Sequence, residues 1–335
     1  MKTKDILIEY FRLIRFSTVG DEVAVILLGG FLMGLRDLYF IGILFIIGLL
    51  GHIFGYVLNE YIDIEVDRKL KYEIKKPLVS GIIPKKNALV IILFAFVSSF
   101  VLTFIYFPNI LSVSLLALAA LLTIIYDVYG KKIPLSDFFV AGTLLVFILF
   151  GASTVNVTIP NLVFIAALIF FFDVVFMNFV EGGIKDIDHD SKAGAKTMAT
   201  RMGVMIKNGK LHITTRFRIF AFILRIAYFS LIMLLGLQSG INLWYSDINV
   251  LYVITVLLMA IVIIFSIRLL YTTTFDKSKL FRLFTVLNST SVILLLVVLF
   301  PILTLWPFIF LLLLPITWFV TFNYALYKRP FQPLV

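Results

Sequence analysis

Residues 38–70 read LYFIGILFIIGLLGHIFGYVLNEYIDIEVDRKL, and they contain the clearest indication of the fold. It begins with an apolar run of about twenty residues, the length that a helix needs to cross the hydrocarbon core of a bilayer. At the end of the run, Asn59, Asp63 and Asp67 follow one another at four-residue spacing. Side chains at this spacing share one face of a helix. The stretch therefore predicts a membrane helix whose polar end carries a row of oxygen ligands.

The composition of the whole chain is typical of an integral membrane protein. Of its 335 residues, 61% are hydrophobic and 14% are charged, whereas soluble domains are about 45–50% apolar. The chain has no cysteine, which excludes disulfide frameworks, thiol nucleophiles and cysteine-based metal sites. The net charge of +10 could indicate a nucleic-acid partner. The positions of the basic residues explain this charge by membrane topology instead, so we expect membrane lipids and no nucleic acid as partners.

Apolar runs of about 20 residues predict an all-α, polytopic membrane protein with a single domain over residues 1–335. Ten spans are predicted, at 9–33, 38–60, 87–107, 109–127, 136–156, 161–181, 216–237, 248–271, 280–299 and 303–326. Pro301 and Pro307 interrupt the last apolar stretch, so nine spans are the alternative. Lys328 and Arg329 favour ten, because nine spans would leave them on the outer side of the membrane.

The basic residues predict the orientation of the chain in the membrane. With the N-terminus in the cytoplasm, the inner segments contain Lys2, Lys4, Arg12, Arg15, Lys131, Lys132, Lys328, Arg329 and the basic residues of 68–86, 185–218 and 268–282. The outer loops contain almost none besides Arg36. This asymmetry follows the positive-inside rule. It predicts a multi-pass protein of the cell membrane with both termini and its acidic clusters on the cytoplasmic side.

A second acidic pair, Asp186 and Asp190, repeats the four-residue spacing just after another apolar span, with Glu181, Lys185 and Asp188 nearby. Carboxylate and amide oxygens suit Mg²⁺, which binds through one or two carboxylates together with substrate phosphates. The two acidic rows therefore predict a site for Mg²⁺ and a phosphorylated ligand. The alternative is that these carboxylates are solvated helix ends, but their repeated spacing favours function.

A phosphorylated ligand also needs cationic side chains. The candidates nearest to the acidic rows are Arg68, Lys131, Lys132 and Lys185. Tyr126 precedes Lys131 by five residues, so a phenol and an ammonium could meet the same leaving group. The alternative for each basic residue is that it serves topology alone.

Two further residues are candidates for contacts to substrate. Asp173 lies inside the sixth predicted span, where a carboxylate is costly unless it is paired or lines a polar cavity. We expect it to contact the acceptor substrate or to bond to a neighbouring helix. Arg15, in the first predicted span, is the second candidate.

These patterns resemble the signatures of the UbiA superfamily of intramembrane prenyltransferases. The first signature is the series Asn59, Asp63 and Asp67 in LNEYIDIEVDRKL, followed by KKPLVSG at residues 75–81. The second is KDIDHDSKAGAKTMATRMG at residues 185–203. The order of the signatures and the intervening Tyr126 and Lys131 are also similar. The chain departs from the family where Glu60 replaces the usual Asp, and where Ser17 and Thr18 follow the first-helix arginine in place of Asn.

The resemblance implies a UbiA-like bundle of nine or ten helices around a central cavity, and an Mg²⁺-dependent prenyltransferase. A polyprenyl diphosphate would give its prenyl group to a lipophilic or aromatic acceptor. The two acidic rows would hold the metal, while Lys131, Arg68 and Tyr126 would assist loss of diphosphate. The acceptor stays open between an aromatic quinone precursor and a glycerol-phosphate or sugar-type hydroxyl.

The main alternative is a secondary transporter, in which acidic residues and glycine-interrupted helices bind ions and substrate. Such residues should lie near the middle of the bilayer, whereas the acidic rows lie at the ends of the predicted spans. A phosphatidyl-alcohol transferase is a second alternative, but neither row has the Asp-Gly, Ala-Arg and Gly series that its motif requires.

Overall fold

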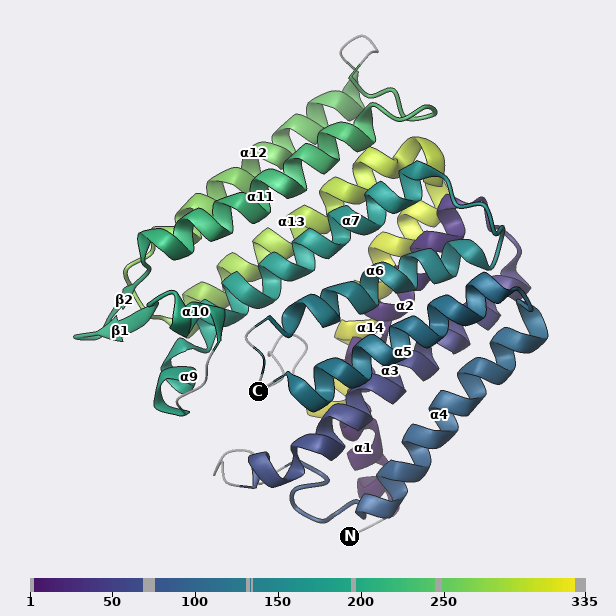
Figure 1. The fold of residues 1–335 in the computed structure, drawn as a ribbon, viewed down its shortest axis with the longest axis horizontal. Helices are drawn as coiled ribbons and strands as arrows, with labels where there is room; N and C mark the ends of the chain where they lie inside the picture. The colour runs from purple at the N-terminus through teal and green to yellow at the C-terminus, as the bar shows by residue number, and fades with distance from the viewer. Residues whose placement is uncertain are drawn as a thin grey trace. The chain divides into compact units, whose positions relative to one another are not determined.

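The computed structural model describes residues 3–68, 76–130, 133, 135–193, 197–244 and 249–328, and most of them are helical (Figure 1). Eight of the described helices are long and apolar enough to cross a membrane: Leu38–Glu65, Lys85–Tyr106, Ile110–Tyr129, Asn161–Lys185, Thr215–Gly236, Val250–Leu270, Lys277–Leu303 and Leu305–Tyr327. A shorter apolar helix spans Asp137–Ser153. The predicted all-α, multi-pass membrane fold is therefore confirmed, and the number of spans, nine or ten, stays a prediction.

The elements follow the predicted spans closely. In chain order they are α1 (Thr3–Leu13), η1 (Phe16–Thr18), α2 (Val19–Leu32), α3 (Leu38–Asp67), α4 (Lys85–Tyr106), α5 (Ile110–Tyr129), α6 (Asp137–Ser153), α7 (Asn161–Phe176), η3 (Met177–Gly182), α8 (Gly183–Lys185), α9 (Ile187–Ala193), α10 (Met198–Arg201), β1 (Met205–Lys207), β2 (Lys210–His212), α11 (Thr215–Gly236), α12 (Val250–Leu270), α13 (Lys277–Leu303) and α14 (Leu305–Tyr327).

The chain is interrupted at Arg15, inside a predicted span, and at Thr304, between two prolines. The first predicted span, 9–33, is broken between α1 and α2, where Arg15 adopts a left-handed backbone with φ 45°. This conformation is unfavourable for a residue with a side chain and cannot continue a helix. Near the other end, Thr304 with φ 66° separates α13 from α14. Pro301 and Pro307 therefore flank a turn between two helices.

The chain folds into two compact units, and the prediction of a single domain stays untested. The first unit comprises Met1–Val128, Val146–Ile159 and Ile309–Val335. Within it α3 packs along α4 and α2. Helices α2 and α6 cross at Gly29 and Gly151, where an added Cβ on either glycine would collide with the facing backbone at Ile148 or Ile26. Small residues allow helices in membranes to approach this closely.

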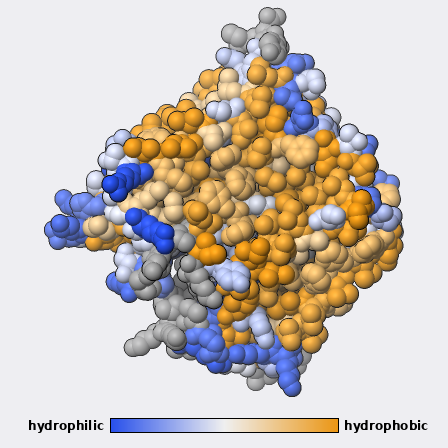
Figure 2. Space-filling view, in the orientation of Figure 1, coloured by the Kyte–Doolittle hydropathy of each residue, from blue (hydrophilic) through white to orange (hydrophobic). Residues whose placement is uncertain are grey.

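The second unit comprises Tyr129–Leu145 and Pro160–Phe308. Its helices α7, α11, α12 and α13 lie side by side (Figure 1). The strands β1 and β2 form a hairpin in which Asn208 and Gly209 both have positive φ, as a two-residue hairpin turn requires. Figure 2 shows hydrophilic side chains at this hairpin and apolar ones along the helices. On α11 the apolar Ile219, Ile223 and Ile226 are exposed, which is typical of a lipid-facing surface.

Candidate functional site

The first acidic row lies at the end of α3, as predicted. Asp67 is buried, with 3% of its surface exposed, and Asn59 and Asp63 are half-buried. Because the helix continues without interruption to Asp67, the three side chains follow one another at successive turns. The row therefore presents one amide and two carboxylates on a continuous helix.

A lysine that the sequence analysis did not single out binds this row. The Nζ atom of Lys76 lies 2.9 Å from Oδ2 of Asp67 and 3.3 Å from Oε2 of Glu60. The other oxygen of Glu60 accepts a 2.8 Å hydrogen bond from Nη2 of Arg15. Positive and negative side chains thus alternate in the order Arg15, Glu60, Lys76 and Asp67. This alternation gives each of the two buried carboxylates a cationic partner, as buried charges require.

The left-handed backbone at Arg15 places its guanidinium beside the row. The guanidinium carbon lies 5.0 Å from the centre of the Tyr56 ring, and the group is bonded to Glu60. Strained backbone conformations persist where the surrounding structure holds them, often at functional sites. The structure thus brings Arg15 to the first acidic row, and its contact with substrate stays a prediction.

Helix α5 contributes a carboxylate that the sequence analysis missed. Nδ2 of Asn59 donates a 3.0 Å hydrogen bond to Oδ1 of Asp127, a buried residue directly after Tyr126. Tyr126 is half-buried at the same end of α5. Lys131, predicted to act together with Tyr126, lies outside the described residues. The described part of α5 therefore brings Asp127 to the first row.

Arg68 follows the first row directly but pairs elsewhere. Its Nη1 lies 3.2 Å from Oε1 of Glu65, and both side chains are largely exposed. Lys85 contacts the same oxygen of Glu65 at 3.1 Å. An exposed side chain of this length can move, so the predicted role of Arg68 in loss of diphosphate stays a prediction.

The second acidic row lies in the other unit, with Asp186 between α8 and α9 and Asp190 within α9. Asp186 is partly exposed and lies 3.5 Å from the ammonium of Lys185, and the ring of His189 lies 3.7 Å from Asp190. Burial, reinforced by the negative charge of Asp186, raises the pKa of Asp190. Such a raised pKa is typical of carboxylates that are grouped in one place. The two acidic rows belong to different units.

Two further residues belong to the surroundings of Asp190. Asp137, the first residue of α6, lies near enough for its carboxylate to be repelled by that of Asp190. Gly183 allows α10 to pack against α8, because an added Cβ would lie 2.8 Å from the Cβ of Ala199. The sequence signal for Asp137 was weak, since a lone acidic residue at a helix start is a common stabiliser of the helix dipole.

Asp173 has a partner on a neighbouring helix. Its Oδ1 accepts a 2.8 Å hydrogen bond from Nη1 of Arg225, which is 3% exposed. The same nitrogen lies 3.3 Å from the hydroxyl of Ser291, and Nη2 lies 3.9 Å from Oε1 of Glu181. One guanidinium therefore serves two buried carboxylates between α7, η3 and α11. The bond from Asp173 to a neighbouring helix is one of its two predicted contacts. The other, contact with the acceptor substrate, stays a prediction.

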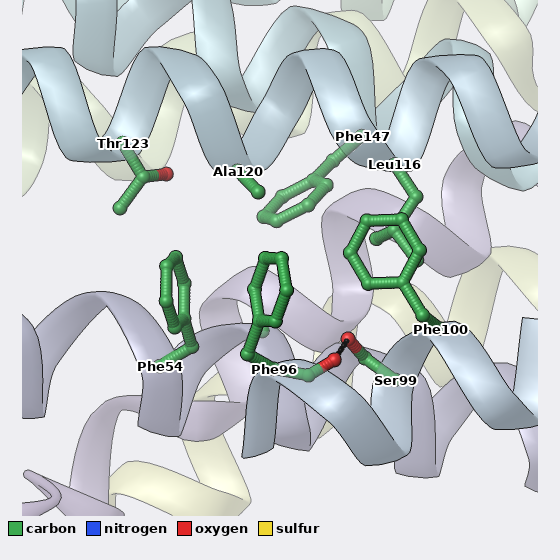
Figure 3. A pocket seen from close by; sticks show the side chains of 9 residues that line it. Phe54, Phe96, Ser99, Phe100, Leu116, Ala120, Thr123 and Phe147 are labelled. Atoms are coloured by element: carbon green, nitrogen blue, oxygen red, sulfur yellow. Dashed lines mark hydrogen bonds between the residues drawn. The ribbon is translucent and has the colours of Figure 1, made fainter. Parts of the chain in front are cut away.

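A groove lined by aromatic rings lies in the first unit (Figure 3). Its cavity volume is about 20 Å³, and it is lined by Gly51, Phe54, Phe96, Ser99, Phe100, Leu116, Ala120, Thr123 and Phe147. Rings from α3 and α4 face small side chains of α5 across the space (Figure 3). We call this the aromatic groove. Gly51, one of its lining residues, lies on α3 two turns before Asn59.

Polar contacts hold α5 at both ends of the aromatic groove. At one end Asn59 of α3 bonds to Asp127. At the other end the hydroxyls of Ser112 and Ser153 lie 2.8 Å apart and join α5 to α6. Between these contacts the walls are mostly apolar, so the groove suits a hydrocarbon chain better than a polar ligand.

The donor set fits a magnesium site that is completed by its ligand. Within the part of the chain that the structure describes, no three His, Asp or Glu side chains form a ready metal cage. Mg²⁺ does not need one, because it retains waters and binds through one or two carboxylates plus substrate phosphates. Asn59, Asp63 and Asp67 supply such oxygens, and Lys76 shows that the row attracts a cation.

Comparison with known proteins identifies the family. A model of the UbiA prenyltransferase family matches residues 23–288, which include both acidic rows. The chain belongs to this family. No curated protein matches its sequence. The predicted family and its UbiA-like helical fold are thus confirmed.

Solved structures agree with this assignment, each with a TM-score of 0.62. A digeranylgeranylglyceryl phosphate synthase is 20% identical, and the match covers 90% of this chain and 100% of the other. The UbiA homologue from Aeropyrum pernix K1 is 16% identical, with coverage of 84% and 96%. A UbiA homologue from Archaeoglobus fulgidus, bound to GPP and Mg²⁺, is 17% identical, with coverage of 88% and 99%. At these identities the likeness shows the UbiA fold.

Proposed function

We propose that this protein is an intramembrane prenyltransferase that moves a prenyl group from a polyprenyl diphosphate to an acceptor. The observation that carries the proposal is the match to the UbiA family over residues 23–288, which contains both acidic rows in their order. A structure of similar fold that binds GPP and Mg²⁺ supports it. In a membrane protein, acidic residues grouped at helix ends indicate a ligand site more often than a surface of lipid contact.

In this proposal the two acidic rows hold Mg²⁺ and the diphosphate. The metal-holding residues are Asn59, Asp63, Asp67, Asp186 and Asp190. When bound, Mg²⁺ neutralises negative charge on the departing diphosphate. The side chains of the chain itself orient the oxygens and keep the site anionic enough to attract the metal.

Cationic side chains stabilise the diphosphate as it leaves. Lys76 is well placed for this role, because its ammonium already lies against Asp67 and Glu60. Lys185 has the corresponding place beside Asp186 in the second row. Lys131, Arg68 and Tyr126 are the further candidates from the sequence. Preorganised cations and donors at a leaving group are a major source of rate enhancement.

The apolar part of the substrate needs a separate place. The aromatic groove offers one, because it is apolar and its residue Gly51 lies on the same helix as the first acidic row. Arg15 and Asp173 are proposed as contacts to substrate, with Arg15 already beside the first row. Exclusion of water by the apolar walls would protect a reactive allylic cation from hydrolysis.

The acceptor is an aromatic quinone precursor or a glycerol-phosphate or sugar-type hydroxyl. We further propose that the acidic rows face the cytoplasm, because the basic residues of the chain accumulate in the loops on that side. Both proposals refine the same activity and can be tested independently of it.

The test is transfer by purified protein. The protein in lipid nanodiscs is incubated with Mg²⁺, labelled geranylgeranyl diphosphate and each acceptor class in turn, and products are identified by mass spectrometry. A prenylated acceptor is expected from one class, together with diphosphate. Uptake of the intact prenyl diphosphate or of an ion into proteoliposomes, without cleavage, would instead support the secondary transporter.

A further inference from the structure

Asn59 and Asp127 join two helices at the first acidic row. Nδ2 of Asn59 on α3 donates to Oδ1 of Asp127 on α5 over 3.0 Å. One turn earlier, the helices approach closely, because a Cβ on Gly55 would lie 3.4 Å from Cγ2 of Thr123. The hydrogen bond therefore lies where α3 and α5 are packed together.

The second oxygen of Asp127 has no obvious use in the fold. Asp127 is 8% exposed, and its Oδ2 accepts no hydrogen bond from any residue that the structure describes. A buried carboxylate oxygen without a partner is costly. A serine or an asparagine at this position could join α3 and α5 equally well. The second oxygen of Asp127 therefore indicates that a ligand binds here.

The hydrogen bond also determines how the Asn59 amide is turned. Nδ2 is the atom of Asn59 that donates to Asp127, so the NH₂ group of the amide faces Asp127. The amide oxygen then faces away from Asp127. Of the two ends of the amide, the oxygen is the one that a metal ion can bind.

The negative charge around this contact calls for a cation. Asp63 follows Asn59 by one turn of α3, and its carboxylate is close enough to repel that of Asp127. Lys76, the described cation on this row, is bonded to Asp67 and Glu60. Two carboxylates from different helices and one oriented amide are thus grouped at one place.

We propose that Asp127 is a positioning residue of the first metal site. Its Oδ1 holds the Asn59 amide so that the amide oxygen faces the metal, and its Oδ2 accepts a hydrogen bond from a water that Mg²⁺ retains. The inference rests on the proposed function, because it assumes that Asn59 and Asp63 bind Mg²⁺. Partners of this kind, which orient ligands without replacing them, strongly affect metal affinity.

The experiment measures metal binding without turnover. Mn²⁺, a paramagnetic substitute for Mg²⁺, is titrated into the purified protein and free Mn²⁺ is followed by electron paramagnetic resonance. Asp127→Asn keeps the shape and the bond to Asn59 but replaces the accepting Oδ2 by a donor, so affinity should fall about tenfold. Asp127→Ala also frees the amide and should lose at least as much. Glu65→Gln is the control, because it removes an exposed charge from the same helix and should change affinity less than twofold.

A second readout separates positioning from a structural role. If Asp127 acts on the metal, Asp127→Asn should raise the Mg²⁺ concentration needed for half-maximal turnover about tenfold. Turnover at saturating Mg²⁺ should stay within about twofold of wild type, because the catalytic groups are unchanged. Loss of turnover at all Mg²⁺ concentrations, with unchanged Mn²⁺ affinity, would overturn the proposal.

Asp63→Ala distinguishes failure of this inference from failure of the proposed function. If Asp63→Ala abolishes Mn²⁺ binding while both Asp127 variants bind like wild type, Asp127 has no part in the site and the proposed function stands. If Asp63→Ala binds Mn²⁺ like wild type, the metal site itself is wrong. Size-exclusion chromatography and thermal unfolding confirm that each variant is folded.

Discussion

The ammonium of Lys76 lies 2.9 Å from the carboxylate of Asp67, at the last position of the first acidic row. The same ammonium lies 3.3 Å from Glu60, which is bonded to Arg15. Lys76 thus neutralises buried carboxylates that would otherwise repel one another. In a metal-binding enzyme this lysine would stabilise the metal-free state and face the diphosphate once the substrate is bound.

Lys76→Gln should destabilise the metal-free protein. It leaves Asp67 without its described cationic partner, and loss of a charged partner in a buried position costs about 1–3 kcal/mol. We expect a lower thermal unfolding midpoint in the absence of Mg²⁺, measured in detergent by intrinsic fluorescence. Added Mg²⁺ should raise the midpoint more in the variant than in wild type, because the ion then supplies the missing positive charge.

Lys85→Gln is the matched control, since Lys85 pairs with the exposed Glu65. Exposed ion pairs contribute about 0–1 kcal/mol, so its midpoint should hardly change. Equal effects of the two substitutions would contradict the assigned role of Lys76.

The aromatic groove predicts an effect on the length of the prenyl chain. An added Cβ at Gly51 would already lie 3.3 Å from Cζ of Phe147, so Gly51→Leu should fill the groove. We expect kcat/KM to fall about tenfold or more for geranylgeranyl diphosphate relative to geranyl diphosphate. Gly42→Leu is the control on the same helix, because nothing lies within 4 Å of a Cβ added there. If both variants keep the wild-type preference for chain length, the groove does not hold the prenyl chain.

The pair of Arg225 and Asp173 should be important for stability. Both side chains are buried, and Arg225 also lies 3.9 Å from Glu181. Arg225→Met leaves two buried carboxylates without their cation, and such losses cost about 3–5 kcal/mol. The unfolding midpoint should fall sharply, and the double variant Arg225→Met with Asp173→Asn should recover part of the loss. If Arg225→Met alone is as stable as wild type, the two carboxylates do not need the charge of Arg225, and its assigned role in stability is wrong.

The proposed orientation predicts which loops face the cytoplasm. Because the chain has no cysteine, a single introduced cysteine is its one reactive thiol. A membrane-impermeant maleimide should label Thr158→Cys in intact cells. It should label Lys192→Cys only after the cells are lysed. Labelling of Lys192→Cys in intact cells would contradict the cytoplasmic position of the second acidic row.

The helices could be predicted from the sequence because their apolar runs are long and polar turns separate them. The break at Arg15 could not. Residues 9–33 are apolar enough to read as one span, and the bond from Arg15 to Glu60, 45 residues away, is not visible in local sequence. The turn at Thr304 was signalled by the prolines around it, since proline removes a backbone donor and disfavours continued helix.

The acidic rows were also visible in the sequence, because four-residue spacing places side chains on one helix face. Their partners were less visible. Asp127 and Lys76 reach the first row from other segments, so that only the folded chain brings them together. Arg225 carried a signal that could have been used, because an arginine within an apolar span requires a buried partner. Asp173, 52 residues earlier, is that partner.

We propose that the acidic rows release diphosphate from a prenyl diphosphate with the help of Mg²⁺. The most direct measurement is diphosphate release by the purified protein, with Mg²⁺ or with a chelator, for wild type, Asp63→Ala and Asp186→Ala. Wild type should release diphosphate with Mg²⁺ and none with the chelator, and each folded variant should release it at least about 100-fold more slowly. Release that is unchanged by the chelator or by both substitutions would show that the acidic rows do not act through Mg²⁺.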